Sequence, residues 1–161
     1  MPLTQPQAKV IKDKARFRVL ITGRRFGKTY LAINELAKFA SRSKQKVWYV
    51  APTYRQAKQI VWNELKQKLI DHKWVKNINH SDLTFTLKNN STITLRGSDN
   101  ENALRGVGID FLVIDEFADV SKEAWYEVLR PTLSDKKGHA LFCGSPRGFG
   151  NWSYELYKQG E

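Results

Sequence analysis

The stretch from Phe17 to Ala40, FRVLITGRRFGKTYLAINELAKFA, decides the fold of this 161-residue chain. Its first five residues, Phe17 to Ile21, are mostly apolar, which is typical of a buried strand. From Thr29 to Ala40, apolar residues recur at helical spacing and predict a helix. The glycine-containing segment between them links a strand directly to a helix, which is the context of a phosphate-binding loop.

The linking segment reads Thr22-Gly23-Arg24-Arg25-Phe26-Gly27-Lys28-Thr29. Its glycines allow backbone N–H groups to approach phosphate oxygens, and the helix N-terminus adds its positive end. We expect Lys28 to bridge the outer phosphates and the Thr29 hydroxyl to ligate Mg²⁺. Either arginine of the loop could reach the terminal phosphate. The common pattern begins with glycine, whereas this sequence has Thr22 there and its first glycine one place later.

Two acids follow a second apolar run, Phe111 to Ile114. A carboxylate at the end of a buried strand is costly unless it is paired or bound to a metal. Asp115 is therefore expected to hold Mg²⁺ through its water shell, and Glu116 to polarise the attacking water as general base. Ser145 follows a later apolar run and has a hydroxyl that could sense the terminal phosphate. Two solvated acids and an ordinary glycine-proline turn are the plainer alternatives.

Strand-like and helix-like segments alternate along the chain, which predicts an α/β fold with a mostly parallel sheet flanked by helices. Two runs of alternating apolar and polar residues around Asn89-Asn90-Ser91 predict a β-hairpin insertion. The expected strands are 17–21, 47–50, 111–114 and 140–143, the hairpin strands are 83–87 and 93–95, and the helices are 29–40, 56–69 and 121–130, the last capped by Ser121 and stopped by Pro131.

The composition is basic: Lys and Arg number 27 against 16 Asp and Glu, so the net charge is +11 and the pI is about 9.8. Such a charge favours a polyanionic partner, most commonly nucleic acid. A solvated basic surface is the alternative. The sequence has no apolar run long enough to span a bilayer, so no membrane partner is expected.

Taken together, these motifs resemble the ATPase domain of phage terminase large subunits. The resemblance rests on the order and spacing of five segments, Gly23–Thr29, Ala51-Pro52-Thr53, Leu104-Arg105-Gly106, Val113–Glu116 and Gly144–Gly148. It implies a P-loop NTPase of the additional-strand type, with Walker A and Walker B motifs and a catalytic glutamate. Residues 1–161 would form one such domain, truncated at its C-terminal end and without the family's nuclease domain.

The resemblance also implies roles for single residues. Gln7 would read the adenine, Arg24 would contact the outer phosphates, Arg105 would act in trans on a neighbouring subunit, and Ser145 would belong to the coupling motif. The implied nucleotide-binding residues are Gln7, Thr22, Gly23, Arg24, Arg25, Phe26, Gly27, Lys28 and Thr29, the catalytic ones Glu116, Lys28, Arg24 and Arg105, and the metal ligands Thr29 and Asp115.

By the same resemblance, the chain would hydrolyse ATP with Mg²⁺ to drive double-stranded DNA into a viral prohead in the host cytoplasm. Its partners would be a ring of identical subunits, the portal protein and the small terminase subunit. A helicase-like, DNA-stimulated ATPase and a DNA-binding assembly module without hydrolysis are the two alternatives.

Overall fold

The computed structural model describes residues 16–21, 27–134 and 136–144. Within them lies a seven-stranded sheet with the order β1-β7-β6-β2-β5-β4-β3. The strands are β1 (Phe17–Ile21), β2 (Lys46–Ala51), β3 (Val75–Asn79), β4 (Thr84–Leu87), β5 (Thr92–Gly97), β6 (Phe111–Asp115) and β7 (His139–Gly144). The first five in the sheet order are parallel, and β4 pairs antiparallel with both of its neighbours, β5 and β3. The predicted mostly parallel sheet is confirmed, and β7 is the additional strand between β1 and β6.

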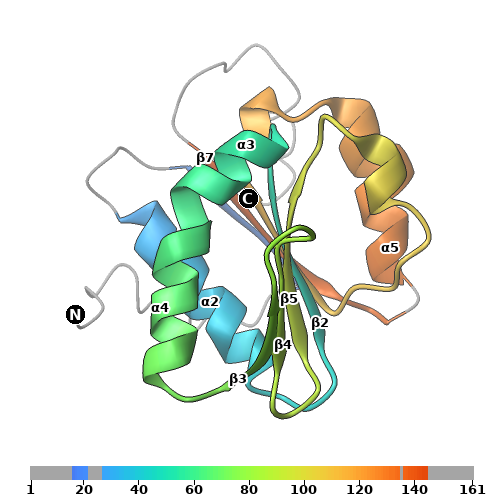
Figure 1. The fold of residues 1–161 in the computed structure, drawn as a ribbon. Coiled ribbons are helices and arrows are strands. Elements are labelled where there is room, and N and C mark those ends of the chain that lie inside the picture. The colour runs from blue at the N-terminus through green and yellow to red at the C-terminus, as the bar shows by residue number, and fades with distance from the viewer. Residues whose placement is uncertain (1–15, 22–26, 135, 145–161) are drawn as a thin grey trace.

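Helices cover both faces of the sheet, as Figure 1 shows. On one face lie α2 (Lys28–Ala40) and a continuous helical run made of α3 (Tyr54–Ala57), the π-helical η2 (Lys58–Trp62) and α4 (Asn63–Asp71). On the other lie the π-helical η5 (Ala124–Leu129) and α5 (Arg130–Ser134), with the short 3₁₀ helices η3 (Glu101–Leu104) and η4 (Phe117–Asp119) in the loops. Each face has its own apolar cluster. None of the helices in the described ranges is long and apolar enough to cross a membrane.

The predicted hairpin is formed by β4 and β5. The Leu87 N–H donates to the Ser91 carbonyl across the turn at 2.8 Å, and Asn90 takes the left-handed conformation (φ 68°) that asparagine tolerates. β5 then lies parallel to β2, so the hairpin widens the sheet. The edge strand β3 was not predicted, because its mostly exposed, polar residues lack the apolar alternation of a half-buried strand.

The prediction that Pro131 ends the helix beginning near Ser121 is wrong. Ser121 does cap it, since its hydroxyl accepts the Ala124 N–H at 3.1 Å. The helical run then continues through Pro131 to Ser134. A proline ring clashes with the carbonyl four residues earlier in a regular α-helix. The wider π-helical turn immediately before Arg130 relieves that clash, which the sequence pattern does not reveal.

A buried ion pair joins the first strand to the helix that follows the glycine loop. Arg18 of β1 donates to Glu35 of α2, and both side chains are almost fully buried. Breaking such a pair leaves an uncompensated buried charge, which costs about 3–5 kcal/mol. The pair therefore holds α2 against β1.

Candidate active site

The carboxyl ends of β1, β6 and β7 lie at one edge of the sheet, and among the described residues this edge carries Asp115 and Glu116. Asp115, the last residue of β6, is in register with Cys143 of β7, and β7 also pairs with β1. Lys28 begins α2 just beyond the loop that follows β1. Its Nζ lies 3.7 Å from Oε1 of Glu116, so residues from two motifs that are distant in the sequence meet in the structure.

Gly27 sets the direction in which α2 begins. It has φ 78° and ψ 45°, a left-handed conformation that glycine adopts without the penalty of a Cβ, and its carbonyl accepts the Leu31 N–H at 3.0 Å. The next two residues, Lys28 and Thr29, therefore occupy the first turn of α2. N–H groups of a first helical turn have no partner within the helix, which makes this turn suited to an anion.

Asp115 is a buried carboxylate with two neutral donors. Its side chain is 5% exposed; Oδ2 accepts the Tyr49 hydroxyl at 2.5 Å, and Oδ1 accepts the Glu116 N–H at 2.9 Å. No lysine or arginine among the described residues forms a salt bridge with it. Burial, and then the charge of Asp115, raise the pKa of Tyr49 far above its ordinary value, so its hydroxyl remains a donor.

Glu116 turns the chain out of the sheet. Its φ of 47° and ψ of 48° are left-handed, which is unusual for a residue with a long side chain and is the kind of strain that functional sites retain. The side chain is 31% exposed and reaches Lys28, itself 12% exposed. Behind this turn, Phe117 packs so closely on Gly144 that a Cβ there would lie 3.0 Å from the ring.

These residues fit a divalent cation held with few protein ligands. Asp115, a buried acid that forms no salt bridge with the described residues, and Thr29, in the first turn of α2, supply the hard oxygen ligands that such a cation takes. The described residues contain no group of three or more His, Cys, Asp or Glu side chains that could enclose a metal. Mg²⁺ bound with a nucleotide usually keeps several waters and uses one or two carboxylates and the phosphates, so a full protein cage is not required.

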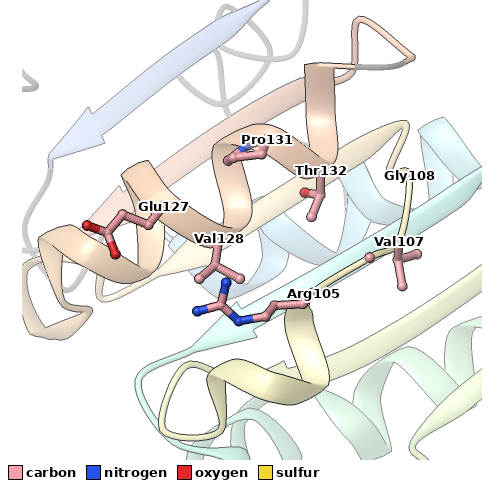
Figure 2. Close-up of a pocket in the computed structure, with 8 residues that line it drawn as sticks. Arg105, Val107, Gly108, Glu127, Val128, Pro131 and Thr132 are labelled. Carbon is pink, nitrogen blue, oxygen red and sulfur yellow. The ribbon is translucent and has the colours of Figure 1, made fainter.

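Arg105 lies apart from these residues. It follows η3, whose Leu104 packs in the apolar cluster on the face opposite α2, and it is 55% exposed with Glu101 at 3.9 Å. It lines a cavity of about 330 Å³ together with residues of η5 and α5 (Figure 2). The Arg105 side chain is therefore available at the surface of the chain rather than inside its own Lys28–Asp115 site.

Several predicted site residues lie outside the described part of the chain. They are Gln7, Thr22, Gly23, Arg24, Arg25, Phe26 and Ser145. A role for Tyr49 at the site was not predicted. Its partner, Asp115, lies on another strand, and an apolar run that contains a tyrosine is typical of any buried strand. Cys143 is buried, and burial raises the pKa of its thiol, so it remains a protonated core residue.

The fold is that of a large terminase ATPase domain. A solved structure of this domain from Thermus phage P74-26 is 26% identical with a TM-score of 0.84, and the match covers 98% of this chain and 69% of that one. The large terminase of another thermophilic bacteriophage, in complex with ATP-gamma-S, shares the fold, with 19% identity and a TM-score of 0.79 over 98% of this chain and 42% of that one.

Residues 19–159 match the family model described as terminase large subunit, T4likevirus-type, N-terminal. The terminase large subunit of Escherichia phage T5 is 32% identical over 162 residues. This chain therefore belongs to the family of phage terminase large subunits. The T5 match covers 96% of this chain and 36% of the T5 protein, so the chain spans about a third of the length of that relative.

Proposed function

We propose that this chain is an ATPase domain that hydrolyses ATP to ADP and phosphate at the site between Lys28 and Asp115. The observation that carries the proposal is the meeting of Lys28 and Glu116 at 3.7 Å beside the buried Asp115. The large terminase of phage P74-26 has an ATPase domain, and that of the second thermophilic phage binds ATP-gamma-S. ATP is accordingly the nucleotide proposed here.

In this proposal each described residue has one task. Lys28 would neutralise the outer phosphates, and Thr29 and Asp115 would hold Mg²⁺, which would supply further positive charge to the phosphates. Glu116 orients the attacking water and accepts its proton. Because phosphate oxygens and Glu116 compete for Lys28, a bound nucleotide would release the Glu116 carboxylate to act on water.

Further assignments rest on family resemblance, and those of Gln7, the loop from Thr22 to Phe26 and Ser145 concern residues outside the described ranges. Gln7 would recognise the adenine, and the loop from Thr22 to Phe26 would wrap the phosphates, with Arg24 on the outer ones. Ser145 would couple the state of the terminal phosphate to movement. Residues 1–161 would form a single ATPase domain, and no nuclease activity is assigned to them.

The hydrolysis would drive double-stranded DNA into a prohead in the host cytoplasm. A ring of identical subunits, the portal protein and the small terminase subunit would be its partners. Membership of the terminase family favours this task over that of a helicase-like ATPase. The paired Lys28 and Glu116 favour hydrolysis over a passive DNA-binding module.

Replacing Lys28 by Ala tests the nucleotide site. The variant should bind a fluorescent ATP analogue with Mg²⁺ about 10–100-fold more weakly, because the phosphates lose a charge-assisted hydrogen bond. Equilibrium fluorescence titration measures it. Lys38→Ala, at the exposed last turn of the same helix, is the matched control and should bind as the wild type does. Wild-type affinity in Lys28→Ala would contradict the assignment.

Binding to double-stranded DNA should depend strongly on salt and little on sequence. Phosphate contacts release counterions, so raising salt from about 50 to about 200 mM should weaken binding by about tenfold or more. Fluorescence anisotropy with two duplexes of equal length and different sequence measures both properties. Affinity that is indifferent to salt, or no binding at the lower salt, would exclude DNA as the partner of this chain.

A further inference from the structure

Tyr49 contacts the proposed metal site from β2, a strand of which no residue has a role in the proposed function. On β2 it pairs in register with Val113 of β6, and Asp115 follows Val113 by two residues on the same face of the sheet. Tyr49 is 0% exposed, and its ring lies in the apolar cluster beneath α2. The one polar atom of its side chain, the hydroxyl oxygen, lies 2.5 Å from Oδ2 of Asp115.

We propose that Tyr49 is a positioning residue for Asp115, whose buried hydroxyl holds the carboxylate in the one orientation that receives Mg²⁺. The inference rests on the proposed function. With the Glu116 N–H on Oδ1 and the Tyr49 hydroxyl on Oδ2, each oxygen of Asp115 is held once from the protein side. A carboxylate has about four acceptor sites, so each oxygen keeps capacity for water of the metal shell.

A comparison of the buried acids supports this role. Two carboxylates of the described residues are buried, Glu35 and Asp115. Glu35 has the guanidinium of Arg18 as its partner, which is how a charge inside a core is ordinarily accommodated. Asp115 instead receives two neutral donors, one of them a phenol supplied by the neighbouring strand. Neutral donors orient a carboxylate without neutralising it, so its charge remains available to a cation.

Replacing Tyr49 by Phe removes only the hydroxyl and keeps the buried ring, so the fold should be retained. A fluorescent ATP analogue is titrated into the chain first in EDTA and then at increasing Mg²⁺. In EDTA the affinity of Tyr49→Phe should equal that of the wild type. The Mg²⁺ concentration for half of the metal-dependent gain in affinity should rise about 10–100-fold, which is typical when a residue that orients a metal ligand is lost.

Turnover should follow the same pattern. At low Mg²⁺ the kcat of Tyr49→Phe should fall, and high Mg²⁺ should restore most of it, while KM for the nucleotide at saturating metal should stay near the wild-type value. A residue that only fills the core would not shift the metal requirement. Tyr54→Phe is the matched control, because it also removes a phenol hydrogen bond, to the Ser81 carbonyl, but leaves Asp115 untouched.

Three outcomes have distinct meanings. An unchanged Mg²⁺ requirement in Tyr49→Phe, with a wild type that does bind nucleotide through Mg²⁺, overturns the positioning role alone. Loss of binding in EDTA as well would overturn it too, because the hydroxyl would then support the whole pocket rather than one carboxylate. A wild-type chain whose nucleotide binding ignores Mg²⁺ overturns the proposed metal site itself.

Discussion

Replacing Glu116 by Gln should leave Mg²⁺·ATP bound and lower turnover about 10²–10⁴-fold, which is the usual contribution of a positioned general base. The amide matches the carboxylate in size but cannot accept a proton from water. Glutamine can also occupy the left-handed turn no worse than glutamate, so the path of the chain from β6 into η4 should persist. Phosphate release measures turnover, and titration with the fluorescent analogue measures binding.

A matched change at an exposed glutamate separates the effect of losing one negative charge from the effect of losing the carboxylate at position 116. Glu123→Gln removes the same charge just before η5, where the residue is exposed, and should hydrolyse ATP at the wild-type rate. The ion pair with Lys28 adds a second expectation. Glu116→Gln should bind nucleotide at least as tightly as the wild type, because Lys28 no longer has a carboxylate competing with the phosphates. A variant that hydrolyses normally would remove Glu116 as the base.

Mixing two inactive variants should restore ATP hydrolysis if Arg105 acts between subunits. Arg105→Ala keeps an intact pocket, and Glu116→Gln keeps an intact arginine. In a mixed assembly, the intact pocket of some Arg105→Ala subunits faces the intact Arg105 of a neighbouring Glu116→Gln subunit. An arginine supplied in trans is worth about 10³–10⁵ in rate, so each variant alone should be nearly inactive and the mixture clearly active.

The position of Arg105 is the reason to expect this. Its loop packs over the apolar cluster opposite α2, its side chain is 55% exposed, and its ion pair with Glu101 at 3.9 Å is exposed and therefore weak. Arg130→Ala removes an exposed arginine from α5 and is the control. It should hydrolyse ATP as the wild type does, without being mixed with a second variant. Mixtures shown by light scattering to co-assemble, yet lacking turnover, would indicate that Arg105 serves only its own loop.

Local sequence patterns predicted the elements that carry the site. The apolar runs ending at Ile21 and Ile114, and the helical spacing after Lys28, correspond to β1, β6 and α2. Such patterns succeed because a strand buried on both faces must be apolar and a helix must keep one apolar stripe. The parallel order also follows, since helices between strands return the chain to the same edge. It is this order that brings Lys28 and Glu116 together.

The sequence could not predict features that depend on one element meeting another. The path through Pro131 depends on a π-helical turn, and the edge strand β3 depends on pairing with β4 rather than on its own polar residues. The packing of Leu104 in the apolar cluster opposite α2 likewise depends on tertiary contacts, although the family resemblance had already placed Arg105 at a neighbouring subunit.

By itself, then, the sequence determined that this chain has a strand, a phosphate-binding type of loop, a helix and a later pair of acids. Each of these features depends only on residues that are close together in the sequence. Only the tertiary structure decided that Glu116 turns back toward Lys28 and that Asp115 is held by Tyr49. Those contacts depend on sheet register and on a left-handed residue at the strand end. Register is fixed by pairing between segments distant in the chain, and no local pattern specifies which side chains it will place together.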